Sequence, residues 1–519
     1  MGNTEHVEFG ESLVTVDQIL AIAERGATVS LSEDPTFRAK LGAGAELLAA
    51  RLAAGERVYG VTTGFGESCL AEVADEQVPS LPLNLLRFHG CGTGRIFDEA
   101  ESAAIVAVRL ASLVRGWSAV RPVLIERMID LLGRRVLPRI PAEGSVGASG
   151  DLTPLSYVAA MLVGERECSF RGRERLSAEV LVELELEPIT LAPKESLAIM
   201  NGTSVMTALV CLALSRAQRL ARISAAVTAT VSDALGGNPA HFDLRIFTAK
   251  PHAGQARYAQ WVREDLEYLP GPSFEGRIQD RYSIRCAPHV AGVLLDALPW
   301  MLDWTQTELN GANDNPLIDP DTGEALHGGN FYGGHACFVA DGLKNLVANL
   351  ADLHDRQLAL MCSVHTNNGL PENLNGHTGP DSAAHHGFKA MQIGASALAA
   401  EALKNTMPAS VFSRSTECHN QDKVSMGTIA AREALRVVVL SEQVMAILLL
   451  AAAQAVDLRE RAGGQCRWRS LALRDAVRKR APFVDRDRRQ DRDIAAVLDM
   501  IRTQDLPAHL VPDLGLGDA

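Results

Sequence analysis

The feature that most constrains the fold is a long run of residues, 203–235, that contains neither glycine nor proline. Because these two residues are the usual breakers of helices, the run predicts one helix of roughly 50 Å. Stretches such as 447–453 are apolar all round, so neighbouring elements must cover more than one face of the helix that contains them. Further helices are predicted over 12–55, 101–117, 123–136, 290–310, 335–364 and 428–462, of which 101–117 and 123–136 are amphipathic.

No stretch alternates convincingly between apolar and polar residues at period two, so we expect a mainly α fold. The predicted architecture is a bundle of long helices with a smaller N-terminal region that carries the catalytic loops, extended by contacts between subunits. Along the chain we expect an N-terminal region over 1–200, the central bundle over 201–462 and a C-terminal cap over 463–519. Arginines alternate with acidic residues in the cap, which is typical of a solvated surface.

Composition narrows the classes of partner and compartment. The chain has 519 residues, 47% of them hydrophobic, and a net charge of −13, which argues against nucleic acid and anionic membrane as partners. Nine scattered cysteines without CxxC pairs indicate reduced thiols rather than a disulfide framework. Residues 1–11 have no signal-peptide pattern, and the apolar run 443–456 is too short to cross a bilayer. We therefore expect a soluble cytoplasmic protein.

A glycine-rich loop occupies 144–156, with Gly144, Gly147 and Gly150 inside seven residues. Glycines permit backbone conformations that a β-carbon forbids. Thr153 followed by a proline predicts the N-cap of a helix that ends at Gly164. On the glycines alone, a simple connection or an anion cradle explains the loop better than chemistry does.

The triplet Ala148-Ser149-Gly150 inside this loop supports a chemical interpretation. If the backbone bends sharply, the amide nitrogen of Gly150 can attack the carbonyl carbon of Ala148. Loss of water there and from Ser149 leaves a methylidene-imidazolone ring. Such a ring is a strong electrophile made from the chain itself, placed beside a helix N-terminus that favours negative charge.

Three motifs resemble those of the aromatic amino acid lyases and 2,3-aminomutases, the family of histidine, phenylalanine and tyrosine ammonia-lyases. They are the loop 144–156, Tyr-Gly-Val-Thr-Thr-Gly-Phe-Gly at 59–66 and Asn-Asp-Asn-Pro at 313–316, and matches continue in family order to Met426. The resemblance implies the compact bacterial form of the family, a homotetramer with shared active sites. It also implies that the ring is the only prosthetic group, without metal or dissociable cofactor.

The resemblance assigns roles to two tyrosines. Tyr59 matches the base that removes a proton from the β-carbon of the substrate, on a loop that covers the site. A phenol has an ordinary pKa of about 10, so we expect helix N-termini or a cation to lower the pKa of Tyr59. Without the motif, Tyr59 would be interpreted as an anchor of the loop in the core. Tyr282 matches a second catalytic tyrosine that organises the ring and proton transfer.

A further group of residues matches the positions that bind the substrate or the ring. Arg285 matches the arginine that binds the substrate carboxylate, for which a guanidinium fork is the suitable geometry. Asn201 matches the asparagine that contacts the ring oxygen or the substrate, although Asn-Gly is also an ordinary helix-start signal. Arg281 does not match and is expected to be solvated. The remaining members of the group are Gly66, Gln279, Asn315 and Phe331.

Two places bear on the choice of substrate. Phe88-His89 stands where phenylalanine lyases have Phe-Leu, tyrosine lyases have His-Leu and histidine lyases have Ser-His. Phe88 suits an apolar ring, whereas His89 can hydrogen-bond a phenol. Histidine lyases have a glutamate at the position of Gln421, so a neutral amide there argues against imidazole. The resemblance therefore implies an ammonia-lyase that converts L-tyrosine or L-phenylalanine into coumarate or cinnamate.

Several alternatives stay open. Glu67, directly after Gly66, resembles tyrosine aminomutases, which return the amine to the β-carbon and release a β-amino acid. The retention of the intermediate that this requires depends on the stiffness of the lid. Histidine ammonia-lyase, an inactive helical scaffold and a fumarase-type lyase are further hypotheses. The chain has no HExxH motif or phosphate-binding loop, and His385 and His386 are expected to be surface or core residues rather than metal ligands.

Overall fold

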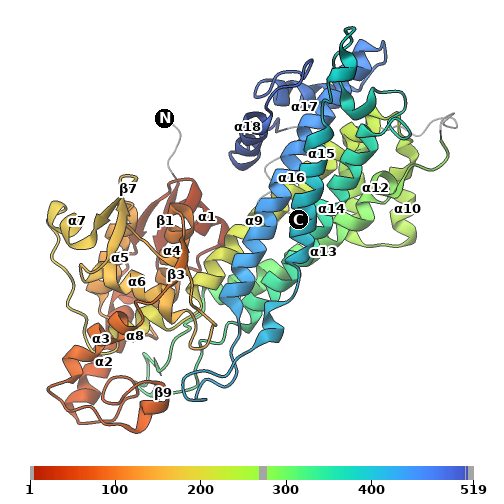
Figure 1. Ribbon diagram of the computed structural model, residues 1–519. Helices are drawn as coiled ribbons and strands as arrows, with labels where there is room; N and C mark the ends of the chain where they lie inside the picture. Colours follow the sequence, from red (N-terminus) through yellow and green to blue (C-terminus); the bar gives the residue numbers. More distant parts are fainter. Residues whose placement is uncertain (1–4, 268–276, 509, 512–519) are drawn as a thin grey trace. The chain divides into compact units, whose positions relative to one another are not determined.

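The computed structural model describes residues 5–267, 277–508 and 510–511 (Figure 1). The chain forms two compact units, each assembled from three separate segments. Unit 1 consists of Met1–Leu212, Leu302–Asp341 and Pro408–Glu433. Unit 2 consists of Ala213–Met301, Gly342–Met407 and Ala434–Ala519. The predicted division into 1–200, 201–462 and 463–519 consists of continuous segments, whereas each compact unit combines three distant segments. The predicted division therefore stays a prediction.

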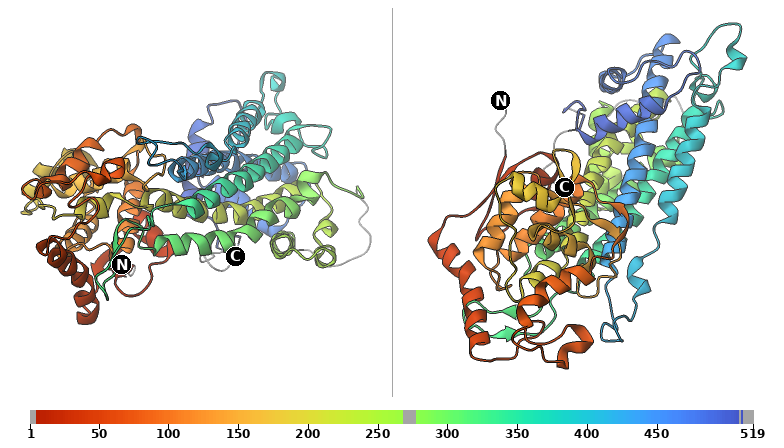
Figure 2. Two further views of the ribbon diagram at one scale, coloured as in Figure 1. Left: turned by 90° about the horizontal axis from the view of Figure 1, so that it is seen from below. Right: turned by 60° about the vertical axis from the view of Figure 1, so that its left-hand side comes forward.

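The four long helices expected from the sequence are present. They are α9 (Ser204–Ala234), α13 (Ala287–Leu309), α14 (Gly334–Cys362) and α16 (Gly427–Arg461). Within unit 2, Arg216 of α9 pairs with Glu442 of α16, and the Ser441 hydroxyl of α16 donates to the carbonyl of Val347 on α14. Figure 2 shows these helices lying side by side. The mainly α fold is confirmed, and the apolar circumferences are covered by neighbouring helices.

Unit 1 also contains shorter helices and small sheets. Its helices are α1 (Val16–Glu24), α2 (Pro35–Ala53), α3 (Leu81–Phe88), α4 (Glu99–Leu113), α5 (Pro122–Gly133), α6 (Leu152–Leu162), α7 (Ser177–Glu183) and α8 (Glu195–Met200). Its strands are β1 (His6–Phe9), β2 (Thr28–Leu31), β3 (Thr93–Ile96), β4 (Leu137–Pro138), β5 (Pro141–Glu143), β6 (Glu167–Phe170), β7 (Arg173–Leu176), β8 (Leu317–Ile318) and β9 (Ala325–Leu326). The strands form the parallel pair β1-β2 and the antiparallel sheets β3-β5, β4-β6-β7 and β8-β9.

Two expectations about unit 1 need correction. The predicted helical region 12–55 is two helices with β2 between them, because β2 pairs with β1 from outside the region. The predicted amphipathic helix 101–117 is α4, in which every residue from Glu101 to Leu113 is buried. A capping box fixes the start of α4, since Asp98 and Glu101 each accept a hydrogen bond from the other's backbone amide.

The remaining helices of unit 2 are shorter. They are α10 (Leu244–Ala249), α11 (Ala253–Asp265), α12 (Tyr282–Arg285), α15 (Lys389–Lys404), α17 (Trp468–Arg478) and α18 (Asp491–Arg502). The arginines of the C-terminal segment are less solvated than expected. The side chains of Arg474 and Arg478 are 18% and 16% exposed, and both pair with Asp457 of α16. These partly buried ion pairs attach the segment to the helices of unit 2.

Helix α16 is longer than the apolar run recognised in the sequence. By length and composition alone it passes the test for a membrane-spanning helix, with a mean hydropathy of 2.0 over its most apolar window. However, 83% of that window is buried inside the molecule, as in the core helix of a globular protein. Burial explains the apolar composition of α16 without a bilayer.

Candidate active site

The Ala-Ser-Gly triplet is folded back on itself in unit 1. Ala148 and Gly150 form an antiparallel bridge, and Gly150 pairs in parallel with Gly202. Gly150 has a φ of +70°, and a β-carbon at this position would collide with the carbonyl oxygen of Gly202. Glycine is therefore required here both by the backbone conformation and by the close approach. Helix α6 begins at Leu152 rather than after Thr153, so the triplet lies two residues closer to the helix than predicted.

Asp151 fixes the exit of this loop. Its carboxylate is fully buried and accepts hydrogen bonds of 3.0 Å from the amides of Val205 and Met206 in the first turn of α9. It also accepts from the hydroxyls of Ser145 and Thr428. Burial raises the pKa of Asp151, and these hydrogen bonds oppose that rise. Asp151 was not predicted from the sequence, although an acid directly after the triplet and before a helix was a signal.

The Asn201-Gly202 turn lies against the triplet and rests on a buried arginine. The guanidinium of Arg109 is fully buried and donates to the carbonyl of Asn201 across 3.2 Å. Burial lowers the pKa of Arg109 to about 10. The amide of Asp151 donates to the carbonyl of Gly202 across 2.7 Å, which ties the turn to the loop. Arg109 was also missed, because nothing on α4 marks it as part of a site.

The residues present fit a methylidene-imidazolone ring. The Asn201 side chain is 3% exposed, and its buried Oδ1 has no hydrogen-bond partner. A buried amide without a partner is unfavourable unless another polar group meets it. The bare backbone of Gly150 and Gly202 leaves no room for side chains beside Ser149. The bare glycines and the folded triplet are therefore compatible with a ring at this position, and Oδ1 of Asn201 is left to accept from a donor on a bound molecule.

Gln421 contacts the central residue of the triplet. Its side-chain nitrogen donates to the Oγ of Ser149 across 3.1 Å, and its Oε1 accepts from the hydroxyl of Thr416. Thr416 and Gln421 close a hairpin in which Glu417, Cys418 and His419 all have positive φ. The neutral amide of Gln421 therefore lies against the residue that would lose its hydroxyl.

Tyr59 and Gly66 form the other side of unit 1's candidate site. The Gly66 amide donates to the Tyr59 hydroxyl across 2.8 Å. The Glu417 carboxylate accepts from the Glu67 amide at 3.1 Å, which links the lid loop to the hairpin. Burial raises the pKa of Tyr59, the hydrogen bond from Gly66 opposes this, and the negative charge of Glu417 raises it further. The expected lowering of the pKa is therefore not produced by the residues around Tyr59 in this chain.

Phe88 and His89 lie at the end of α3, next to the start of α6. Their rings are 4.5 Å apart, and Phe88 is 59% exposed. The Nδ1 of His89 is 3.4 Å from the hydroxyl of Thr153, three residues after the triplet. Burial and the charge of Arg166 lower the pKa of His89 to about 4, so the ring is neutral near pH 7. A neutral imidazole can donate or accept a hydrogen bond.

The Asn-Asp-Asn-Pro segment at 313–316 has a fully buried aspartate followed by a half-buried asparagine. Asp314 is fully buried and pairs with the buried Lys194 at 2.7 Å. Asn315 accepts from the amide of Gly329 at 3.1 Å, and Gly329 packs close to the ring of Phe331. Asn315 and Phe331, both assigned to the site, therefore lie together in unit 1.

The other three predicted site residues lie together in unit 2. The guanidinium of Arg285 stacks on the ring of Tyr282, with 4.6 Å between its central carbon and the ring centroid. The Nε of Arg285 donates to the carbonyl of Asp280 across 3.0 Å, and its Nη2 is 3.4 Å from the Oε1 of Gln279. Tyr282 is 73% exposed. The structure thus gathers the predicted residues into two groups, one in each unit.

A group of potential metal ligands lies elsewhere in unit 2. The ligand atoms of His377, Asp381 and His385 lie within 4.8 Å of one another. His377 and Asp381 are hydrogen-bonded at 2.5 Å, and the Asp487 amide donates to Nδ1 of His385. Because Nδ1 of His385 accepts this hydrogen bond, the proton of the imidazole is on Nε2. Nε2 of His385 then has no lone pair for a metal. The arrangement is that of a hydrogen-bonded cluster.

Comparison with known proteins identifies one family over most of the chain. The family model of the aromatic amino acid lyases matches residues 14–479. Histidine ammonia-lyase of Sorangium cellulosum is 37% identical over 507 residues, covering 95% of this chain and 97% of that protein. Histidine ammonia-lyase of Burkholderia multivorans is 39% identical over 453 residues, with 86% and 88% covered.

Solved structures agree with the sequence relatives. Tyrosine aminomutase from Streptomyces globisporus is 35% identical with a TM-score of 0.89, covering 98% of this chain and 99% of that one. Histidine ammonia-lyase from Trypanosoma cruzi is 31% identical with a TM-score of 0.89, covering 99% and 98%. The chain therefore belongs to the aromatic amino acid lyase family and is a carbon–nitrogen lyase.

Proposed function

We propose that this protein eliminates ammonia from L-tyrosine or L-phenylalanine with a methylidene-imidazolone ring formed from Ala148, Ser149 and Gly150. The observation that carries the proposal is the folded triplet, held between Gly202 and Gln421 beside the unpartnered amide of Asn201. When formed, the ring supplies an electrophilic carbon that takes up the departing amine. No metal or dissociable cofactor is required.

The side chains of this protein supply the proton transfer and the orientation of the substrate. Tyr59 takes the proton from the β-carbon, and the amide of Gly66 stabilises its phenolate by hydrogen bonding. Arg285, oriented by Asp280 and by the ring of Tyr282, binds the substrate carboxylate. Because the pKa of Tyr59 is raised, its phenolate needs further stabilisation near neutral pH. A cation near the Tyr59 hydroxyl would supply it.

The resemblance to the aromatic amino acid lyases implies a site that is shared among subunits. Unit 1 holds Tyr59 and Ser149, whereas unit 2 holds Tyr282 and Arg285. We propose a homotetramer in which the second group acts on substrate bound to another subunit's first group. Mixing inactive Tyr59→Phe and Arg285→Gln variants and letting subunits exchange tests this arrangement. Recovered activity in the mixture is expected; no recovery after demonstrated exchange would contradict shared sites.

Residues next to the triplet support a tyrosine or phenylalanine substrate. Gln421 offers a neutral amide, and His89 is a neutral imidazole whose ring adjoins the apolar ring of Phe88. Histidine is the rival substrate, because the similar sequences named above are histidine ammonia-lyases. Purified protein incubated separately with tyrosine, phenylalanine and histidine, with products resolved by mass, decides among them. Exclusive conversion of histidine to urocanate would overturn the proposed specificity.

A 2,3-aminomutase is the second candidate function. The lid segment at Glu67 is tied to the hairpin by the Glu417 carboxylate, and a fixed lid favours retention of the intermediate. One similar structure is a tyrosine aminomutase. Chiral analysis of the amino acids formed from tyrosine and phenylalanine distinguishes the candidates. A β-amino acid as the main product would establish the mutase.

Intact mass tests the ring itself. The purified wild-type chain is expected at the mass of its sequence less two waters, and Ser149→Ala at its full sequence mass. Ser149→Ala and Tyr59→Phe are both expected to abolish turnover, but only Ser149→Ala changes the ring. A wild-type chain that turns over substrate at its full mass would refute the proposal, and an inactive chain at full mass would favour a scaffold role. We further propose that the protein acts in the cytoplasm.

A further inference from the structure

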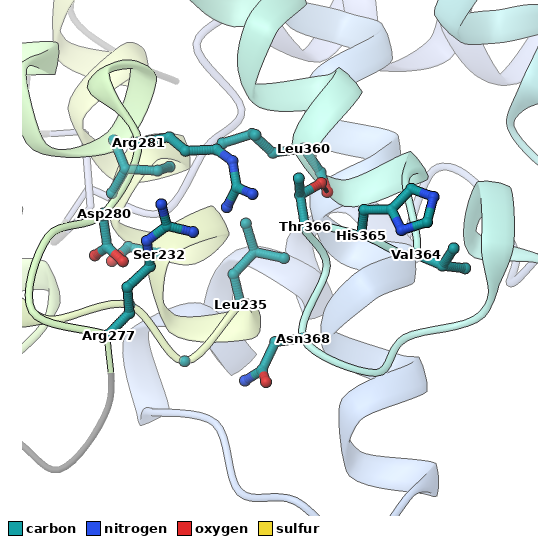
Figure 3. Close-up of a pocket in the computed structure, with 13 residues that line it drawn as sticks. Ser232, Leu235, Arg277, Asp280, Arg281, Leu360, Val364, His365, Thr366 and Asn368 are labelled. Atoms are coloured by element: carbon teal, nitrogen blue, oxygen red, sulfur yellow. Dashed lines mark hydrogen bonds between the residues drawn. The ribbon is translucent and has the colours of Figure 1, made fainter.

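A pocket of about 300 Å³ lies in unit 2 beside residues 277–285, the segment to which Gln279, Tyr282 and Arg285 belong (Figure 3). Its wall is formed by the end of α9, the end of α14 and the loop that follows each helix. Its volume lies at the lower end of the range of small-molecule sites. None of the residues assigned to the proposed reaction lines it.

The pocket contains two arginines without a matching acid. Figure 3 shows the guanidinium groups of Arg277 and Arg281 pointing toward the same space. Arg277 donates from Nε to the carbonyl of Gln279, and the guanidinium of Arg281 has no hydrogen bond or ion pair among the described residues. The pocket's acid, Asp280, accepts from the amide of Asn238 at 2.8 Å and lies 3.6 Å from Nε2 of His241. Two cations thus face one carboxylate that already has partners.

The C-terminal ends of α9 and α14 bring only partial negative charge to the pocket. Carbonyls in the last turn of α14 accept from other donors, as the Leu360 carbonyl does from the Thr366 hydroxyl at 2.6 Å. The hydroxyl of Ser232 on α9 is buried, lines the pocket and has no hydrogen-bond partner. The buried hydroxyl lacks an acceptor, and the exposed Arg277 and half-buried Arg281 can donate to the same bound anion.

The rest of the wall combines four apolar side chains with the polar side chains of His365, Thr366 and Asn368. Leu235, Ile284, Leu360 and Val364 line the space beside the guanidinium groups. Inorganic phosphate would leave these side chains uncovered, whereas a carboxylate attached to an apolar body would meet both kinds of wall. We propose that this pocket binds a small organic carboxylate with an apolar body, at a second site separate from the proposed catalytic one.

The placement gives such a ligand a route to the reaction. Within the segment, Asp280, Arg281 and Ile284 line the pocket, while the catalytic assignments fall on Gln279, Tyr282 and Arg285 between and beside them. Arg285 is held by the backbone carbonyl of Asp280. A ligand that fixes Asp280 and Arg281 therefore acts on the residues that orient Arg285.

Binding of 4-fluorobenzoate to the full-length chain, followed by fluorine NMR, tests the proposal. The titration is made in an Arg285→Gln background, so that carboxylate binding at the proposed catalytic site does not contribute. One molecule per chain is expected to bind. Arg281→Gln and Arg277→Gln are each expected to weaken it by about tenfold or more, because a charged hydrogen-bond partner is lost. The matched control, Arg257→Gln on the exposed face of α11, is expected to bind normally.

A second variant separates lost charge from lost structure. Leu235→Trp enlarges the apolar side chain that lies beside both guanidinium groups and leaves them in place, and it too is expected to abolish binding. Absence of binding in the Arg285→Gln background, or unchanged binding in Arg281→Gln, would overturn the proposal. Equal competition by inorganic phosphate would overturn the requirement for an apolar body. The comparison of wild type with Arg285→Gln tests the proposed function separately, because it concerns a different guanidinium group.

Discussion

The backbone amide of Gly66 donates a hydrogen bond to the hydroxyl oxygen of Tyr59 across 2.8 Å. The next amide, that of Glu67, is held by the carboxylate of Glu417. The same hairpin carries Gln421, which donates to Ser149. The proposed base, its loop and the proposed ring-forming residue are therefore connected through one hairpin, and Glu417 influences Tyr59 both by position and by charge.

Replacing Glu417 with glutamine is expected to shift the pH–rate profile to lower pH. Burial is the main cause of the raised pKa of Tyr59, and the negative charge of Glu417 adds to it. Glutamine removes the charge and keeps one acceptor for the Glu67 amide. The phenolate then forms at lower pH, so the rising limb of the turnover rate moves in the acid direction. Measurement of kcat against pH checks this, with the exposed Glu76→Gln as control. A shift toward alkaline pH would contradict the role of the charge.

Gly150→Ala is expected to prevent ring formation and keep the chain at its full sequence mass. The new β-carbon would collide with the Gly202 carbonyl, and the φ of +70° is unfavourable for alanine. Gly172 is the matched control, since it has the same φ of +70° but open space around it. Gly172→Ala isolates the backbone strain, about 1 kcal/mol, and should leave the ring intact. Full dehydration of Gly150→Ala, by intact mass, would show that close packing is unnecessary.

The buried pair of Lys194 and Asp314 is expected to support the site through stability. Both side chains are fully buried and 2.7 Å apart. Lys194→Met leaves an unpaired buried carboxylate and is expected to cost about 3–5 kcal/mol of unfolding free energy. The double variant Lys194→Met/Asp314→Leu removes both charges and should recover much of that loss. Urea denaturation measures both. In comparison, the exposed pair of Arg134 and Asp130 should contribute less than about 1 kcal/mol.

The long helices could be predicted from the sequence because their signal is local. The absence of helix breakers over 203–235 gives α9 almost to the residue, and α13 continues through Pro299 because tertiary packing outweighs one lost hydrogen bond. The strands could not be predicted, since none of those described exceeds four residues and β2 depends on pairing with β1. Pairing between distant segments leaves no periodicity in either one.

The candidate site likewise contains residues that could be predicted from the sequence and residues that could not. Tyr59, Ser149 and Arg285 were identified because they lie in motifs whose order is a property of the sequence. Asp151, Arg109 and Glu417 were not, because each acts on the backbone of a segment far away in the chain. The pKa of Tyr59 was expected to fall, but burial and a nearby carboxylate raise it. Supporting residues and charge environments depend on packing that no local pattern contains.

His354 is expected to make the protein less stable in acid. Its ring lies on α14, fully buried, and Nε2 is 2.7 Å from the hydroxyl of Ser224. Burial lowers its pKa to about 3, whereas an unfolded histidine has a pKa of about 6.5. Between these two values the unfolded chain binds a proton that the folded chain does not. Stability is therefore lost as pH falls below about 6.5, at up to about 1.4 kcal/mol per pH unit.

His354→Gln is expected to remove this part of the acid sensitivity. Glutamine cannot take up a proton in either state, so the free energy of unfolding should fall less between pH 7 and pH 5 than in the wild type. Urea titrations at the two pH values measure the difference, and the variant's lower stability at pH 7 does not enter the comparison. The exposed His327→Gln should behave like the wild type, because water surrounds that ring in both the folded and the unfolded chain. An equal fall in His354→Gln and wild type would mean that His354 is not the group whose protonation favours unfolding in this range.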